Sequence, residues 1–122
     1  MTDRSVTDIR VVAVPVTDQD RAIEFYAGAL DLTKTMDGVI DEIGTRWVEM
    51  SSPGVAIALV QAYRNFDVGR DTGIRLTTPN AAALHAHLVS RGATVSELLL
   101  WDGLPPMFEF FDIDGNTLYV ME

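Results

Sequence analysis

Residues 9–32 read IRVVAVPVTDQDRAIEFYAGALDL, and this stretch predicts a strand followed at once by a helix. Its first part, residues 9–16, is rich in β-branched side chains, which favour strands. Thr17 and Asp20 have the spacing of a capping box, so we expect the helix to begin at Thr17. The apolar residues that follow at helical spacing are Ala22, Ile23, Tyr26 and Leu30.

Shorter strands separated by turn residues are expected after this helix. The candidates are residues 32–36, 46–50 and 55–61, and the first of them should end at Asp37-Gly38. Residues 63–71 break the pattern with mixed polar side chains, and we interpret them as a linker.

The second half of the chain repeats this order. The predicted elements are a strand at 73–77, a helix at 79–90 capped by Thr78, and strands at 94–100, 107–111 and 117–121. The repeat predicts a single α+β domain over residues 1–122. It consists of two βαβββ modules, at about 6–62 and 72–122, with mixed sheets that curve around a cleft.

Composition restricts the classes of partner. The 122 residues include 18 acidic and 9 basic side chains, which give a formal net charge of −9. Such a chain repels phosphate backbones and anionic lipid, so we expect neither nucleic acid nor membrane as a partner. The sequence contains no cysteine, which excludes disulfides and thiolate metal sites. No apolar run is long enough to span a membrane, and we expect a cytoplasmic protein.

Two stretches resemble the vicinal oxygen chelate superfamily, which contains glyoxalase I, extradiol dioxygenases and bleomycin-resistance proteins. The first runs from Val14 through Phe25-Tyr26 to Leu32. The second runs from Phe111 to Leu118, and its DIDGN at residues 112–116 is similar to the family's Asp-Pro-Asp-Gly-Asn turn, with isoleucine in place of proline. Both are structural signatures, so they imply the glyoxalase/bleomycin-resistance fold without implying an activity.

Metal enzymes of this superfamily hold their ion with four inward-facing His or Glu side chains. The resemblance places these positions on Val11, Ala58, Gly73 (Thr72 if the register slips by one) and Tyr119. Three of the four offer no side-chain donor, and a neutral tyrosine is a weak ligand. The histidines, His85 and His87, point about 200° apart on a helix and cannot share an ion. We therefore expect no metal and no cofactor.

Side chains of the same strand parity should line the cleft. Arg75 would hold a carboxylate, phenolate or carbonyl group of a ligand, or else form a salt bridge with an acidic neighbour. Aromatic pairs would sandwich a flat ligand, although Phe108 and Phe110 alternate as core residues also do. The predicted ligand-binding residues are Val11, Ala13, Trp47, Glu49, Ala58, Arg75, Trp101, Phe108, Phe110 and Tyr119.

The sequence contains no nucleophile–base pair and no glycine-rich phosphate loop, so no catalytic residue is assigned. The resemblance implies a metal-free homodimer of the bleomycin-resistance type that sequesters a hydrophobic or aromatic compound, such as an antibiotic. The alternative is a lyase, isomerase or dioxygenase of the same fold. It would use metal ligands in another register, or acid–base chemistry of Tyr119, Arg75 or Glu49. A regulatory module with a vestigial cleft is the third interpretation.

Overall fold

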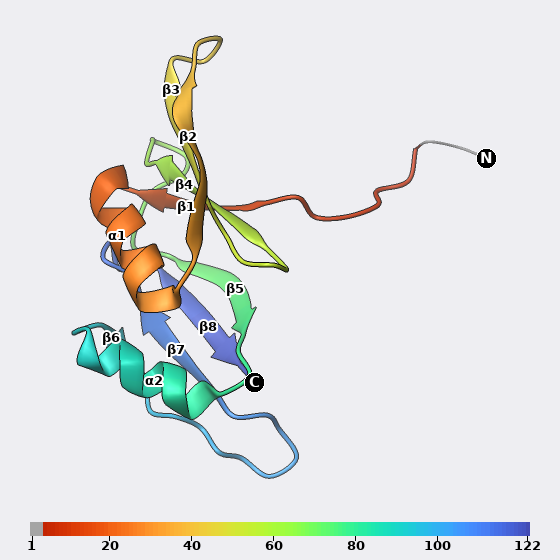
Figure 1. Ribbon diagram of the computed structural model, residues 1–122, viewed down its shortest axis with the longest axis vertical. Helices are drawn as coiled ribbons and strands as arrows, with labels where there is room; N and C mark the ends of the chain where they lie inside the picture. The colour runs from red at the N-terminus through yellow and green to blue at the C-terminus, as the bar shows by residue number, and fades with distance from the viewer. Residues whose placement is uncertain (1–3) are drawn as a thin grey trace.

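The computed structural model describes residues 4–122, which form two modules of the same design (Figure 1). The first module contains β1 (Val12–Val16), α1 (Gln19–Leu30), β2 (Thr33–Ile40), β3 (Thr45–Ser51) and β4 (Ala56–Gln61). The second contains β5 (Asp71–Thr77), α2 (Ala81–Ser90), β6 (Thr94–Val95), β7 (Met107–Phe111) and β8 (Thr117–Met121). The predicted order of elements is confirmed.

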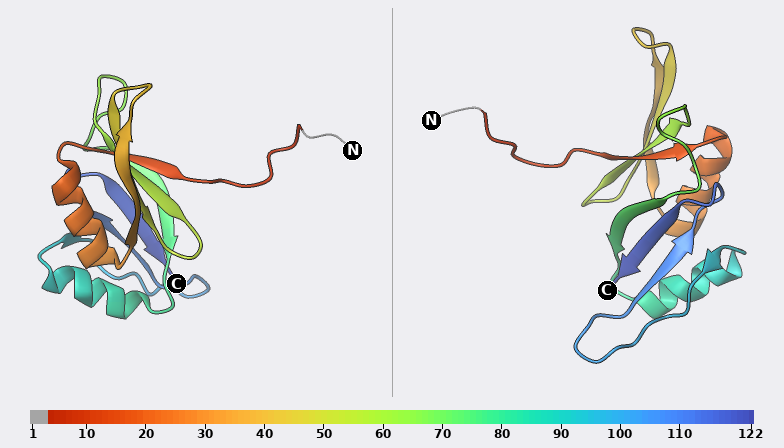
Figure 2. Two further views of the ribbon diagram at one scale, coloured as in Figure 1. Left: turned by 45° about the horizontal axis from the view of Figure 1, so that its top comes forward. Right: turned by 180° about the vertical axis from the view of Figure 1, so that it is seen from behind.

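Each module has a mixed four-stranded sheet, with strand orders β1-β4-β3-β2 and β5-β8-β7-β6. The β1–β4 and β5–β8 pairs are parallel, and the other pairs are antiparallel. The two helices contact each other and lie on the same side of the two sheets (Figure 2). The opposite faces of the sheets are therefore left without a covering helix. The predicted α+β fold of two βαβββ modules is confirmed.

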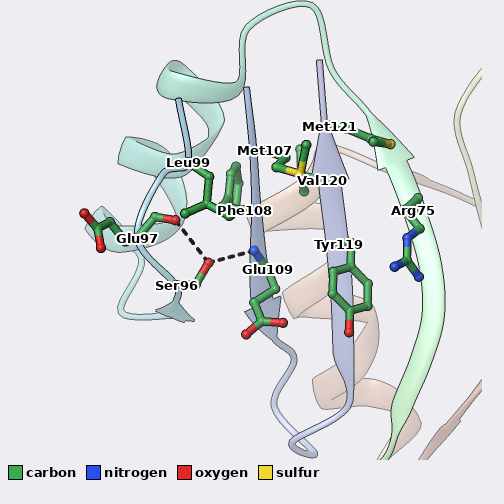
Figure 3. A pocket seen from close by; sticks show the side chains of 10 residues that line it. All are labelled: Arg75, Ser96, Glu97, Leu99, Met107, Phe108, Glu109, Tyr119, Val120 and Met121. Carbon is green, nitrogen blue, oxygen red and sulfur yellow. Dashed lines mark hydrogen bonds between the residues drawn. The ribbon is translucent and has the colours of Figure 1, made fainter. Parts of the chain in front are cut away.

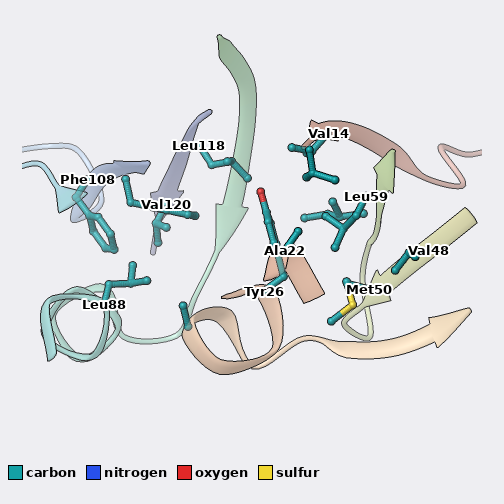
Figure 4. Packing of buried hydrophobic residues seen from close by; sticks show 14 of the residues in the cluster. Val14, Ala22, Tyr26, Val48, Met50, Leu59, Leu88, Phe108, Leu118 and Val120 are labelled. Atoms are coloured by element: carbon teal, nitrogen blue, oxygen red, sulfur yellow. The ribbon is translucent and has the colours of Figure 1, made fainter. Parts of the chain in front are cut away.

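One hydrophobic core joins the two modules because the helix-facing side chains of both sheets meet around α1 and α2 (Figure 4). Strand alternation places every second residue of a strand on this face. The fully buried residues that the two modules contribute include Val14, Tyr26, Met50, Leu59, Leu88, Phe110 and Leu118. The core therefore fixes which face of each sheet remains open.

Both helices begin later than the sequence predicted. The Asp18 side chain caps α1 by accepting a hydrogen bond from the amide of Arg21 at 3.2 Å. The Thr17 hydroxyl instead donates to the carboxylate of Asp114 in the other module. In α2 the cap is Asn80, whose side chain accepts from the Ala83 amide at 3.0 Å. The expected caps at Thr17 and Thr78 are therefore wrong.

Replacing Asp18 with alanine should lower the free energy of unfolding by about 1 kcal/mol, because an amide of the first helical turn loses its acceptor. Asp18→Asn keeps a capping oxygen and should retain most of the stability. Urea denaturation followed by circular dichroism measures both values. Equal losses in the two variants would contradict the assignment of Asp18 as the cap.

Three strands differ most from their predicted ranges, and β3, β4 and β5 differ by one or two residues. β1 begins at Val12, and residues 4–11 run away from the sheets (Figure 1). β2 continues to Ile40 through a register shift between Lys34 and Met36, because Asp37-Gly38 pairs with β3 instead of turning. The strand predicted at 94–100 shortens to β6. Beyond it, the Ser96 side chain accepts from the Glu109 amide at 2.9 Å, in place of a backbone acceptor.

Within residues 4–122, neither helix is long and apolar enough to cross a membrane.

Candidate ligand-binding site

The open faces of the two sheets carry equivalent rows of side chains. In the second sheet, Arg75 on β5 lies beside Tyr119 on β8, and Tyr119 lies beside Glu109 on β7. The positions that correspond in the first sheet, strand for strand, are Ala13 on β1, Ala58 on β4 and Glu49 on β3. The two modules therefore repeat both the order of their elements and the positions of the residues on their open faces.

A cavity of about 430 Å³ lies against the second sheet (Figure 3). This volume lies in the range of about 300–1,000 Å³ that is typical of small-molecule pockets. Most of the lining is apolar or aromatic, with charged side chains at its two sides. The lining residues are Arg75, Ser96, Glu97, Leu99, Met107, Phe108, Glu109, Tyr119, Val120 and Met121.

Arg75 and Tyr119 form a stacked pair on the wall of this cavity. The guanidinium carbon of Arg75 lies 4.1 Å from the centroid of the Tyr119 ring, a cation–π contact. Nη1 of Arg75 also donates to the Gly73 carbonyl oxygen at 2.8 Å. Within residues 4–122, Arg75 forms no ion pair. Of the two interpretations that the sequence left open for Arg75, the salt bridge to an acidic neighbour is therefore not formed among these residues, and the contact with a ligand stays a prediction.

Tyr119 donates a hydrogen bond from its hydroxyl to Oδ2 of Asp71 at 2.6 Å. This hydrogen bond holds the pKa of Asp71 below its ordinary value of 3.8 and raises the pKa of Tyr119. At neutral pH the carboxylate is therefore ionised and the phenol is protonated. Neither pKa is moved toward 7, where acid–base catalysis is most effective.

Tyr119→Phe should raise the pKa of Asp71 toward 3.8, because the carboxylate loses its hydrogen-bond donor. In the wild type, this hydrogen bond stabilises the fold at pH values above the pKa that Asp71 has in the unfolded chain. The contribution of this hydrogen bond is lost as the pH falls through the pKa of Asp71 in the folded protein, which is the lower of the two. The pH dependence of the Asp71 carboxyl carbon in NMR spectra measures the shift. An unchanged titration would show that Tyr119 does not control this carboxylate.

The predicted site residues separate into two groups. Arg75, Phe108 and Tyr119 line the cavity in the second module. Trp47 and Glu49 lie on the open face of the first sheet, where the Trp47 indole donates to Oε2 of Glu49 at 2.7 Å. Ala58 pairs with Glu49 and Ala13 pairs with Ala58, so both predicted residues adjoin this group, whereas Val11 lies just before β1.

Two predicted aromatic contacts lie elsewhere. Phe110 is completely buried and stacks on Phe25 of α1 with ring centroids 6.3 Å apart, so it belongs to the core. Phe108 is also buried, but it borders the cavity and packs edge-on against His85. Trp101 is 58% exposed in the loop between β6 and β7 and does not line the cavity.

The sequence prediction missed Ser96, Glu97, Leu99 and Met107 as lining residues. For Met107 a signal existed, because strand alternation places it on the same face of β7 as Glu109. The other three lie in or beyond the irregular end of β6, where alternation gives no direction.

The residues at the metal-ligand positions do not fit a divalent ion. Val11 precedes β1, and the register places Ala13 opposite Ala58. In the second module a register shift at Gly73, which has a φ of 70°, places Arg75 opposite Tyr119. This set offers one hydroxyl and a cation, which suits no divalent metal.

The rest of the described chain supplies no alternative metal ligand set. Across residues 4–122, no three His, Cys, Asp or Glu side chains are grouped so that they could hold an ion. His85 is hydrogen-bonded to the Ser96 carbonyl and His87 to the Gly28 carbonyl, each at 2.8 Å. Both histidines therefore have structural partners.

The paired βαβββ modules define the glyoxalase/bleomycin-resistance fold, and solved structures of that superfamily confirm the resemblance. A superfamily member from Sphaerobacter thermophilus DSM 20745 is 26% identical over 96% of this chain and 98% of its own, with a TM-score of 0.86. TnmS3, an antibiotic binding protein from Streptomyces sp. CB03234, is 24% identical over 96% of both chains, with a TM-score of 0.85.

A glyoxalase/bleomycin resistance protein from the same Streptomyces strain is also 24% identical, over 94% of this chain and 100% of its own. Its TM-score is 0.82. No protein-family model matches the sequence, and no curated protein matches it.

Proposed function

We propose that this protein is a metal-free, homodimeric binding protein that sequesters a hydrophobic or aromatic small molecule, such as an antibiotic. The observation that carries the proposal is the cavity on the second sheet, which combines an apolar lining with a few charged groups. Organic ligands bind in pockets of this composition, where apolar area supplies affinity and polar groups fix orientation.

The chemistry of the cavity favours binding over reaction. The hydroxyl of Tyr119 is committed to Asp71, and the raised pKa of the tyrosine keeps it protonated. Glu49, the other candidate base, is on the first sheet and accepts a hydrogen bond from Trp47. TnmS3, with the same fold, is an antibiotic binding protein, which adds support from a relative.

The proposed homodimer would cover apolar surface that the single chain leaves exposed. Leu100, Trp101 and Leu104 form an exposed apolar loop that follows the lining residue Leu99. On the first module, Met36 of β2, which pairs with Glu49 on the open face, is also exposed. Because large apolar patches on soluble proteins mark interaction sites, we propose that a second copy packs over the open sheet faces.

A matched pair of variants tests the binding site. Met107→Trp should fill part of the cavity and weaken the binding of flat aromatic compounds at least about tenfold, or about 1.4 kcal/mol. Val89→Trp, at a position 52% exposed on α2 and outside the cavity lining, should leave affinity unchanged. Isothermal titration calorimetry measures both after a panel of aromatic natural products has been screened by tryptophan fluorescence.

Three outcomes would contradict this proposal. The first is that no compound in the panel binds with a Kd below about 1 mM. The second is that a bound compound is recovered chemically changed, which would favour the enzyme alternative. The third is one equivalent of a divalent metal in protein purified without chelator.

A further inference from the structure

Charge is separated across the cavity. Arg75 lies on β5, and Glu109 lies on β7, two strands away, with Tyr119 of β8 between them. Adjacent strands are about 4.8 Å apart, so the two charged residues start roughly 10 Å apart. Glu97, which follows β6, lies on the same side as Glu109 and adds a second carboxylate there (Figure 3).

Neither charged group forms an ion pair in residues 4–122, although the Asp71 carboxylate, hydrogen-bonded to Tyr119, is close enough to attract Arg75 electrostatically. Arg75 has one hydrogen bond to a backbone carbonyl and a stacking contact, but no carboxylate within salt-bridge distance. Glu109 is half-buried, and its carboxylate has no hydrogen-bond partner among these residues. The Tyr119 ring, stacked under the guanidinium, occupies the space between the two groups.

This arrangement selects among charged ligands. A ligand with only an anionic group gains a hydrogen bond from Arg75, but its other end faces Glu97 and Glu109. A ligand with only a cationic group pairs with Glu97 or Glu109, but its other end faces Arg75. A compound that carries both groups at the right separation satisfies both ends, and charge-assisted hydrogen bonds are stronger than neutral ones.

We propose that the cavity binds an amphoteric, flat compound whose apolar body lies over Tyr119, Met107 and Met121. Its anionic group, a carboxylate or acidic phenol, pairs with Arg75. Its protonated amine pairs with Glu109, about 10 Å away. This inference rests on the proposed binding function and specifies its ligand class.

Four probes built on one ring system test the inference. They are 2-methylnaphthalene, 2-naphthoate, 2-naphthylmethylamine and 6-(aminomethyl)-2-naphthoate, which carry no charge, a negative charge, a positive charge and both charges. We expect the doubly charged probe to bind about tenfold more tightly than either singly charged probe. Titration of naphthalene fluorescence measures the four dissociation constants at low salt.

Two variants assign the two ends. Arg75→Gln should weaken the binding of 2-naphthoate and the doubly charged probe about tenfold and leave 2-naphthylmethylamine unaffected or tighter. Glu109→Gln should weaken the binding of 2-naphthylmethylamine about tenfold and leave 2-naphthoate unaffected or tighter. Arg75→Lys retains the charge and should restore most of the affinity for 2-naphthoate, which separates a charge effect from damage to the fold.

The possible failures are distinguishable. If all four probes bind equally, or if both variants weaken every probe alike, the charge assignment is overturned while the binding function stands. If no probe binds, including the uncharged one, and the natural-product panel is also negative, the binding function itself is contradicted. Thermal denaturation of each variant checks that the fold is intact.

Discussion

Replacing Phe110 with alanine is expected to lower the free energy of unfolding by about 3–5 kcal/mol, because it opens a cavity in a close-packed core. Phe110 is completely buried on β7 of the second module and stacks on Phe25 of α1 in the first module. The loss would therefore fall on the contact that joins the modules. Urea denaturation followed by circular dichroism measures it.

Phe111 provides a matched control on the same strand. It follows Phe110 directly, points to the opposite face and is 39% exposed. Phe111→Ala should therefore cost less than about 1 kcal/mol. Similar losses for the two variants would show that Phe110 is not the buried residue of the pair.

The order of elements was predictable because it depends on local patterns. The strands predicted at 107–111 and 117–121 coincide with β7 and β8. Each is a short, largely apolar run bounded by turn residues. Such a pattern can be recognised from a few neighbouring positions in the sequence, without knowledge of distant contacts. Helix starts were less predictable, because the Thr17 hydroxyl is taken by Asp114, which is distant in sequence.

The site was only partly predictable, because alternation assigns residues to a common face but does not say which face the helix covers. Phe108 and Phe110 were correctly placed on one face of β7, but that face packs in the core. Arg75 had two interpretations from sequence. Its stacking on Tyr119 depends on the parallel pairing of β5 with β8, which brings together residues that are distant in the chain.

Asp112→Ala is expected to lower the free energy of unfolding by about 3 kcal/mol or more, because several buried donors lose their acceptor together. Oδ2 of Asp112 accepts from the Tyr26 hydroxyl at 2.7 Å and from Nδ2 of Asn116 at 3.0 Å. Oδ1 accepts from the amides of Asp114 and Asn116 at 2.9 and 3.0 Å. Asp41→Ala, in the exposed β2–β3 turn, should change stability by less than about 0.5 kcal/mol.

Tyr26 makes this network a link between modules, since it lies on α1 whereas Asp112 follows β7. Burial, and then the charge of Asp112, raise the pKa of Tyr26 well above its ordinary value, so the phenol remains a donor at neutral pH. Tyr26→Phe should cost about 1–2 kcal/mol. The double variant should lose less than the two single losses added together, by at least about 0.5 kcal/mol.

A double-mutant cycle with strictly additive losses would contradict a direct hydrogen bond between Tyr26 and Asp112. The same network predicts how the chain unfolds. Asn116 extends the link by donating from Nδ2 to the Pro15 carbonyl of β1 at 2.8 Å. Because both modules share one core and these buried hydrogen bonds, the wild type should unfold in a single transition. In the Asp112→Ala variant, two separate transitions would show that the network, more than the shared core, makes the modules unfold together.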